Sequence, residues 1–263
     1  MTASLPPLGS VRGDLSGRRE FGEAALLAAG DREAYLRSHS GLPGPRGNLE
    51  LIDVASAVSD RADLERWAAL GPEQAPENTP DAFLACVGIV GLGRLVAGGD
   101  RNLLPMLWRA SNDPRWRVRE AVAIGLQAWG DVALVELVGE MERWAAGLPL
   151  EGRAAMAALC EPRLLQEAGV VSRVLAILDR LTMTVRSAAD PRAADVRILR
   201  RALGYGWSVA VVADVEHGLP AFSPWLSDPN PDVRWIVRQN LGKARFARLA
   251  PEFVRAATAG LAG

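Results

Sequence analysis

The sequence predicts an all-α protein, and three observations support this class. Apolar residues recur with a helical period along the chain. No segment shows the sustained alternation of apolar and polar residues that is typical of a half-buried strand. A sequence motif that contains Asp-Pro and Val-Arg recurs at a spacing near 38 residues, which indicates internal repeats. The predicted architecture is therefore an array of repeated helices.

Composition narrows the class of protein further. The chain has 263 residues, 49% of them apolar, and a net charge of -1, which fits one globular domain or two small ones. Lys243 is the only lysine among 30 basic residues, so arginine carries the positive charge. The apolar run 82–93 contains three glycines and ends at Arg94, so it predicts a buried helix rather than a membrane span.

Residues 1–13 predict a flexible N-terminus, because they hold prolines and glycines and no apolar segment behind a basic start. We therefore expect no signal peptide and a cytoplasmic protein. Cys86 and Cys160 lie far apart in apolar helical contexts and predict unreactive core thiols. His39 and His217 are isolated near expected helix ends, so we expect no metal site.

The first 100 residues predict irregular helices joined by long loops. An opening helix at 16–29 is followed by two hairpins, which pair 31–39 with 48–58 and 60–70 with 80–97. Asn48 is the expected N-cap of the helix that follows it. Three prolines and two glutamates predict that 71–80 is an exposed acidic loop.

The clearest single helix covers 115–129. Its apolar stripe follows the spacing i, i+3, i+4, i+7, i+8 and i+11 and consists of Val118, Ala121, Val122, Gly125, Leu126 and Trp129. Asn112 and Pro114 predict its start, because they combine a capping side chain with a first-turn proline. Gly130 is the expected end, in a left-handed conformation.

The turn before this helix recurs later in the chain. Asp113, Asp190 and Asp228 stand 77 and 38 residues apart. Each precedes a Val-Arg pair, namely Val118-Arg119, Val196-Arg197 and Val233-Arg234. The hairpins expected here pair 101–110 with 114–129, 131–146 with 151–160, 170–187 with 193–204 and 216–226 with 231–243, before a terminal helix at 246–260. Two amphipathic helices per repeat are typical of an α-solenoid.

These turns resemble those of the HEAT-repeat family, in which a short turn with Asp is followed by Val-Arg. The resemblance implies a right-handed α-solenoid of about six HEAT-like helical hairpins in a single domain over 14–263. It covers the regular repeats at 100–263 and reaches the irregular repeats at 14–99 by extrapolation. We expect each turn Asp to cap the next helix and the following Arg to reach the Asp of a neighbouring repeat.

Charge distribution points to a candidate binding surface. Residues 1–100 carry 9 Arg and 14 acidic residues, a net of -5, whereas residues 101–263 carry 21 basic and 17 acidic residues, a net of +4. Trp116 and Trp235 are flanked by arginines, as an exposed anchor or a base-stacking residue would be. The candidate concave-face residues are Arg115, Trp116, Arg119, Arg234, Trp235 and Arg238. The alternatives are a solvated arginine face and tryptophans that pack on the adjacent repeat. We expect Trp67, Trp108, Trp129, Trp144 and Trp225 to be core residues.

A second candidate is the Gly- and Pro-rich segment 40–48. Arg46, Gly47 and Asn48 precede a helix N-terminus and could present a guanidinium and backbone N–H groups to an anion. The alternative is an Ω-like loop that packs over the first repeat.

The chain lacks the common catalytic motifs, including the P-loop, the nucleophile elbow and the metalloprotease helix. The sequence therefore favours a non-enzymatic scaffold, without cofactor, metal or membrane, that binds a protein or peptide partner on its concave face. The alternative is a nucleic-acid-binding protein, because the chain also resembles the HEAT-like alkylpurine DNA glycosylases in size and helix plan. That resemblance implies action on alkylated bases, with Arg119 as a phosphate contact and Trp116 as a stacking residue.

Overall fold

The computed structural model describes residues 23–262, and these residues form helices and no strand. The predicted all-α class is confirmed for this part of the chain. The flexible segment expected at 1–13 and the first part of the expected opening helix lie outside the described residues. The chain divides into two compact units, residues 1–91 and 92–263.

The first unit holds short helices with side-chain caps at their N-termini. Its helices are residues 23–28, α2 (Arg32–Ser38), α3 (Leu49–Val58), α4 (Arg61–Ala68) and the first part of α5 (Pro80–Ala97). Asn48 caps α3 as predicted, since its side-chain oxygen accepts the Leu51 N–H at 3.0 Å. Asp31 and Asp60 cap α2 and α4 in the same way.

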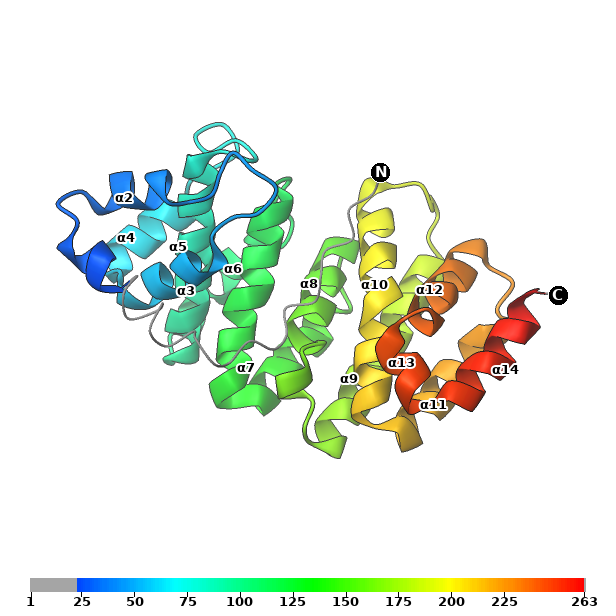
Figure 1. Ribbon diagram of the computed structural model, residues 1–263. Helices are drawn as coiled ribbons and strands as arrows, with labels where there is room; N and C mark the ends of the chain where they lie inside the picture. Colours follow the sequence, from blue (N-terminus) through cyan, green and yellow to red (C-terminus); the bar gives the residue numbers. More distant parts are fainter. Residues whose placement is uncertain (1–22, 263) are drawn as a thin grey trace. The chain divides into compact units, whose positions relative to one another are not determined.

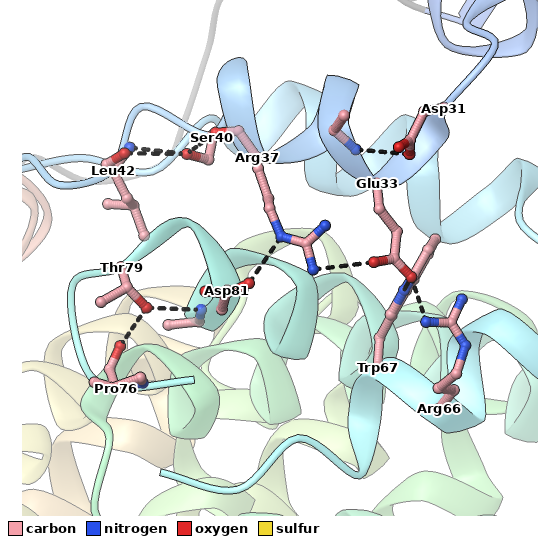
Figure 2. Close-up of polar contacts among 12 residues, drawn as sticks. Asp31, Glu33, Arg37, Ser40, Leu42, Arg66, Trp67, Pro76, Thr79 and Asp81 are labelled. Atoms are coloured by element: carbon pink, nitrogen blue, oxygen red, sulfur yellow. Dashed lines mark hydrogen bonds and ion pairs between the residues drawn. The ribbon is translucent and has the colours of Figure 1, made fainter. Parts of the chain in front are cut away.

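A polar cluster joins three helices of the first unit (Figure 2). Glu33 of α2 accepts a hydrogen bond from Trp67 Nε1 of α4 at 2.8 Å and also pairs with Arg66. Arg37 bridges Glu33 at 3.0 Å and Asp81 of α5 at 2.8 Å. Because each charged group has a partner of opposite sign, the cluster fixes the positions of α2, α4 and α5 relative to one another.

The two loops of the first unit also contact each other. The Gly44 N–H donates to the Asn78 side-chain oxygen at 3.1 Å, which links the 40–48 segment to the 71–80 segment. Residues 71–80 are largely exposed, as predicted for an acidic loop, and fully buried Ala75 anchors them.

The second unit is built around a row of helices. Its elements are η1 (Arg101–Leu103), α6 (Leu104–Ala110), α7 (Trp116–Trp144), α8 (Pro149–Leu159), η2 (Pro162–Leu164), α9 (Ala168–Arg186), α10 (Ala194–Ala213), α11 (Val215–Phe222), η3 (Ser223–Ser227), α12 (Pro231–Leu241), α13 (Ala244–Leu249) and α14 (Pro251–Ala262). Helix α7 packs on α8, α8 on α10, and α10 on α12 (Figure 1). Helices α9 and α11 both pack against α10 and against each other. We call α7, α8, α10 and α12 the helix row.

The predicted break after residue 129 is displaced. The expected helices 114–129 and 131–146 form one run, α7, whose helical geometry breaks at Ala133 with φ -144° and ψ 60°. Gly130 is not left-handed, so its predicted role as the helix end is wrong. A Cβ at Gly130 would lie 2.8 Å from Leu137 Cδ2 and 2.9 Å from Leu164 Cδ1. The packing of these leucines explains why this position has no side chain.

The tryptophans show how far the core prediction holds. Trp67, Trp129, Trp144 and Trp225 are buried, as expected, and Trp207 is fully buried with its indole N–H donating to Thr182 Oγ1 at 2.9 Å. The prediction for Trp108 is wrong, because its side chain is 44% exposed. Short helix α6 buries the adjacent Leu107 instead, and a rotation of about 100° per residue turns Trp108 outward.

Both cysteines are buried free thiols, as predicted. Helices α5 and α7 are long and apolar enough to cross a membrane by length and composition alone. However, 72% of the apolar window of α5 and 50% of that of α7 are buried inside the protein. Core helices of globular proteins commonly meet the same criteria, so these two helices are weak evidence for a membrane span.

Candidate binding face

The turn at Asp113 uses two of the six predicted site residues. The Asp113 carboxylate accepts the Arg115 backbone N–H at 2.8 Å and pairs with the Arg115 guanidinium through Nε at 2.9 Å and Nη2 at 2.7 Å. Arg119 Nη1 donates to the backbone carbonyls of Asp113 and Pro114. Arg115 and Arg119 are only 4% and 8% exposed. Both arginines therefore hold the turn that begins α7.

The expected arginine ladder between neighbouring repeats exists, but other arginines form it. Arg153 of α8 donates to the Arg119 carbonyl at 3.0 Å and pairs with Glu120 of α7. Arg186 pairs with Asp228 at 2.6 Å, and Arg200 of α10 pairs with Asp232 of α12. Each pair joins residues more than 30 positions apart, so the ladder connects helices that belong to successive hairpins.

Trp116 begins α7 at one end of the helix row. Its side chain is 38% exposed, and the Arg117 guanidinium lies 4.4 Å from its ring centre. This distance is within the range of a cation–π interaction. Of the three predicted site residues near the Asp113 turn, Arg115 and Arg119 are buried and Trp116 is exposed.

The other predicted cluster lies on α12, at the far end of the row. Trp235 is half-buried, and its ring packs on Gly204 of α10, where a Cβ would lie 2.8 Å from the ring atom Cζ3. The Arg200 guanidinium lies 4.6 Å from the centre of the Trp235 ring. Arg238 is exposed and Arg234 is half-buried.

The structure separates the two predicted clusters. Helices α8 and α10 stand between α7 and α12 in the row, and packed helices are about 8–10 Å apart. Trp116 is therefore roughly 25–30 Å from Trp235 by this spacing. The six residues do not converge on one patch. Two stabilise a turn, one is exposed at the start of the row, and three lie at its end.

The six predicted residues do not include residues of α10 and α13 that join the α12 cluster. Arg197, Arg201 and Tyr205 follow the spacing i, i+4 and i+8, which places them on one side of α10. The Arg245 guanidinium of α13 lies 4.5 Å from the centre of the Tyr205 ring, and its Nη2 donates to the Tyr205 hydroxyl at 3.0 Å. The four-residue spacing of Arg197, Arg201 and Tyr205 was the signal that could have identified them.

We call this surface the arginine face. It consists of Arg197, Arg201, Tyr205, Trp235, Arg238 and Arg245. Arg197, Arg201 and Arg238 are exposed, and the other three are half-buried. The face thus combines flexible guanidiniums with aromatic rings that packing holds in place.

In the predicted anion loop, Asn48 uses its donor groups within the segment. The Asn48 backbone N–H donates to the Ser40 carbonyl at 2.9 Å, and its side-chain nitrogen donates to the His39 carbonyl at 3.1 Å. Gly47 is half-buried and Arg46 is exposed. These contacts within the segment are those of a self-packed loop.

No group of three or more His, Cys, Asp and Glu side chains is arranged to hold a metal ion within residues 23–262. Burial raises the pKa of the Cys160 thiol to about 12, so it stays protonated at neutral pH. The exposed guanidiniums of the arginine face are suited to carboxylate or phosphate groups.

Comparison with known proteins identifies one repeat. The family model for the HEAT repeat matches residues 103–133, which cover α6, the Asp113 turn and the first part of α7. No curated protein and no solved structure matches the chain. The chain therefore contains a HEAT repeat where the sequence resemblance is clearest. HEAT repeats in general indicate a protein-interaction scaffold.

Proposed function

We propose that this protein is a non-enzymatic scaffold whose second unit binds a protein or peptide partner. In this proposal the helix row continues the HEAT repeat as a right-handed α-solenoid, and the arginine face lies on its concave side. The order of packing supports it, because α8, α10 and α12 follow one another while α9 and α11 pack against α10. Free, buried cysteines are consistent with a cytoplasmic location, which we also propose.

The arginine face is the observation that carries the proposal. Trp, Tyr and Arg are the residue types that most often dominate binding energy at protein interfaces. Here they lie on helices, and contacts to Gly204, Arg200 and Arg245 restrict the two aromatic rings. A preorganised surface loses less conformational entropy on binding than a mobile one.

Photo-crosslinking tests the proposal in two stages. A photoreactive residue in place of Gln239, beside Trp235, should crosslink a partner that the same residue in place of Glu252 on α14 does not. The identified partner is then titrated with purified protein. Arg201→Glu/Arg238→Glu should weaken its binding at least tenfold, whereas Arg143→Glu/Arg255→Glu should leave the affinity unchanged. Arg143 and Arg255 are each 76% exposed and match the change in charge.

Equal crosslinking from both positions would contradict this placement of the binding surface. The same conclusion follows if the partner's affinity is indifferent to Arg201→Glu/Arg238→Glu. Circular dichroism should show the same helical content for the wild type, the two photoreactive variants and the two double arginine variants.

Nucleic-acid binding is the second candidate, supported by the net charge of +4 over residues 101–263. Two findings weaken it. Arg119, the expected phosphate contact, is buried in the Asp113 turn. In addition, Arg200 lies over the Trp235 ring, a position that a stacked base would need. Fluorescence anisotropy with duplex DNA at two salt concentrations tests this candidate. Assays for the excision of alkylated bases from DNA test the hypothesis of a glycosylase activity. Tight binding with a steep salt dependence would reverse the ranking.

A further inference from the structure

We propose that the arginine face binds an acidic peptide segment in an extended conformation. This inference rests on the scaffold function proposed above and specifies the chemistry of the partner. Three features of the face support it: the charge of Arg197 and Arg201, the spacing of these two guanidiniums and the contacts of the aromatic rings.

The first feature is the positive charge of Arg197 and Arg201, which no ion pair of the described residues neutralises. Two carboxylates at or just before the start of α12 are already engaged, since Asp232 pairs with Arg200 and Asp228 pairs with Arg186. Arg197 and Arg201 are exposed on α10, and neither forms an ion pair with a carboxylate of the described residues. A surface of this kind attracts a partner of opposite charge and increases its rate of association.

The second feature is the distance between the guanidiniums. Arg197 and Arg201 are four residues apart on one helix, which corresponds to about 6 Å along the helix axis. Alternate side chains of an extended peptide point to the same side and are about 6.5–7 Å apart. Carboxylates at alternate peptide positions can therefore meet these two guanidiniums in turn. Each such pair can form two parallel hydrogen bonds.

The third feature is the state of the aromatic rings, which favours a peptide over a nucleic acid. Arg200 lies over the Trp235 ring, and the same ring packs on Gly204. Arg245 lies over the Tyr205 ring and is held by its hydroxyl. A stacked base needs an open ring face, and a guanidinium of the protein already lies over each of these rings. The rings instead form a fixed apolar floor beside the guanidiniums, suited to the aliphatic parts of peptide side chains.

The test uses a fluorescein-labelled peptide of twelve residues in which Glu and Ser alternate. We expect its anisotropy to rise on titration with the full chain, and the affinity to fall as salt increases from about 0.05 M to about 0.15 M. Arg197→Glu/Arg201→Glu should weaken binding at least tenfold. The matched Arg143→Glu/Arg255→Glu variant should bind as the wild type does. A peptide of alternating Lys and Ser should not bind.

A single-stranded oligonucleotide with the same number of negative charges is titrated in parallel. The inference is overturned if the Glu-Ser peptide does not bind, if both double variants bind it equally, or if the oligonucleotide binds more tightly through the same arginines. In these cases the scaffold function still stands if the crosslinked partner is lost on Arg201→Glu/Arg238→Glu. If Arg197→Glu/Arg201→Glu has lower helical content, Arg197→Gln/Arg201→Gln takes its place, with a smaller loss of affinity expected.

Discussion

Gly93 provides a direct test of how the second unit is packed. This glycine lies in the last turns of α5 and faces Gly125 of α7, inside the matched HEAT repeat. A Cβ at position 93 would lie 2.3 Å from Gly125 Cα, 2.4 Å from its carbonyl carbon and 2.5 Å from its carbonyl oxygen. All three atoms belong to the backbone, so no side-chain rotation can relieve the contact. Gly93→Ala therefore requires the two helices to move apart.

The cost of this change is the difference between two terms. Overpacking a close-packed interior costs about 1–3 kcal/mol, and a backbone contact this short belongs at the upper end of that range. Alanine has a higher helix propensity than glycine, which returns about 1 kcal/mol. The net loss in the free energy of unfolding is therefore about 2 kcal/mol. For a unit of this size, that corresponds to a fall in Tm of about 4–8 °C.

Urea unfolding followed by circular dichroism measures this loss, with Gly169→Ala as the matched control. Gly169 lies in the first turn of α9, and a Cβ there would meet nothing within 4 Å. Gly169→Ala should therefore raise stability by about 0.5–1 kcal/mol through helix propensity alone. If the two variants change the unfolding midpoint by the same amount in the same direction, the close approach of α5 and α7 is refuted.

Three other predictions concern buried or paired groups. Arg153→Met should lower the free energy of unfolding, measured by urea titration, by about 2–3 kcal/mol. The reason is that it removes the hydrogen bond to the Arg119 carbonyl and the ion pair with Glu120. An unchanged free energy of unfolding would contradict the proposed arginine ladder. Burial raises the pKa of Glu33, but hydrogen bonds from Trp67 and Arg66 and the charges of Arg66 and Arg37 outweigh this and hold the pKa below its usual value. The stability from this lowered pKa is present above the ordinary Glu pKa and is lost as the pH falls through the acidic range, so Glu33→Gln should flatten the acid side of a plot of Tm against pH. Cys160 and Cys86 should not react with a thiol reagent at pH 8 in the native protein, whereas both should react after denaturation; labelling of the native chain would show that one of them is accessible.

The arginines show where sequence reasoning reaches its limit. The sequence identifies Asp113 and Arg119 as parts of a repeated turn, but their expected roles are wrong. Asp113 pairs with Arg115 instead of capping α7, and Arg119 donates to carbonyls of its own turn instead of reaching the Asp of a neighbouring repeat. Arg200 lies outside the repeated motif, so the sequence gives no indication of its role. Its partner Asp232 lies 32 residues away, so only the packing of α10 on α12 reveals the pair.

Glycine and tryptophan illustrate the same limit in the core. Gly130 follows an apolar stripe, as a helix-ending glycine does, yet it is required by leucines at 137 and 164. Trp108 has the composition of a core residue, yet short α6 turns it outward beside buried Leu107. Leu137 lies beyond the break in α7 and Leu164 lies in η2, while the buried side of α6 depends on its packing against α7. Local sequence patterns contain neither kind of information.

The sequence by itself determined the all-α class, the capped helix starts such as Asn48, and the HEAT repeat at 103–133. The helix caps depend on neighbours within about one turn of helix, and the repeat is a pattern along the chain, so the order of residues is sufficient for both. The tertiary structure alone decided which arginines are buried in turns, which connect successive hairpins and which remain exposed on the arginine face. That face joins α10, α12 and α13 through contacts such as Trp235 on Gly204 and Arg245 on Tyr205. Burial and pairing depend on residues about 30 to 40 positions apart, and only the folded chain brings these together.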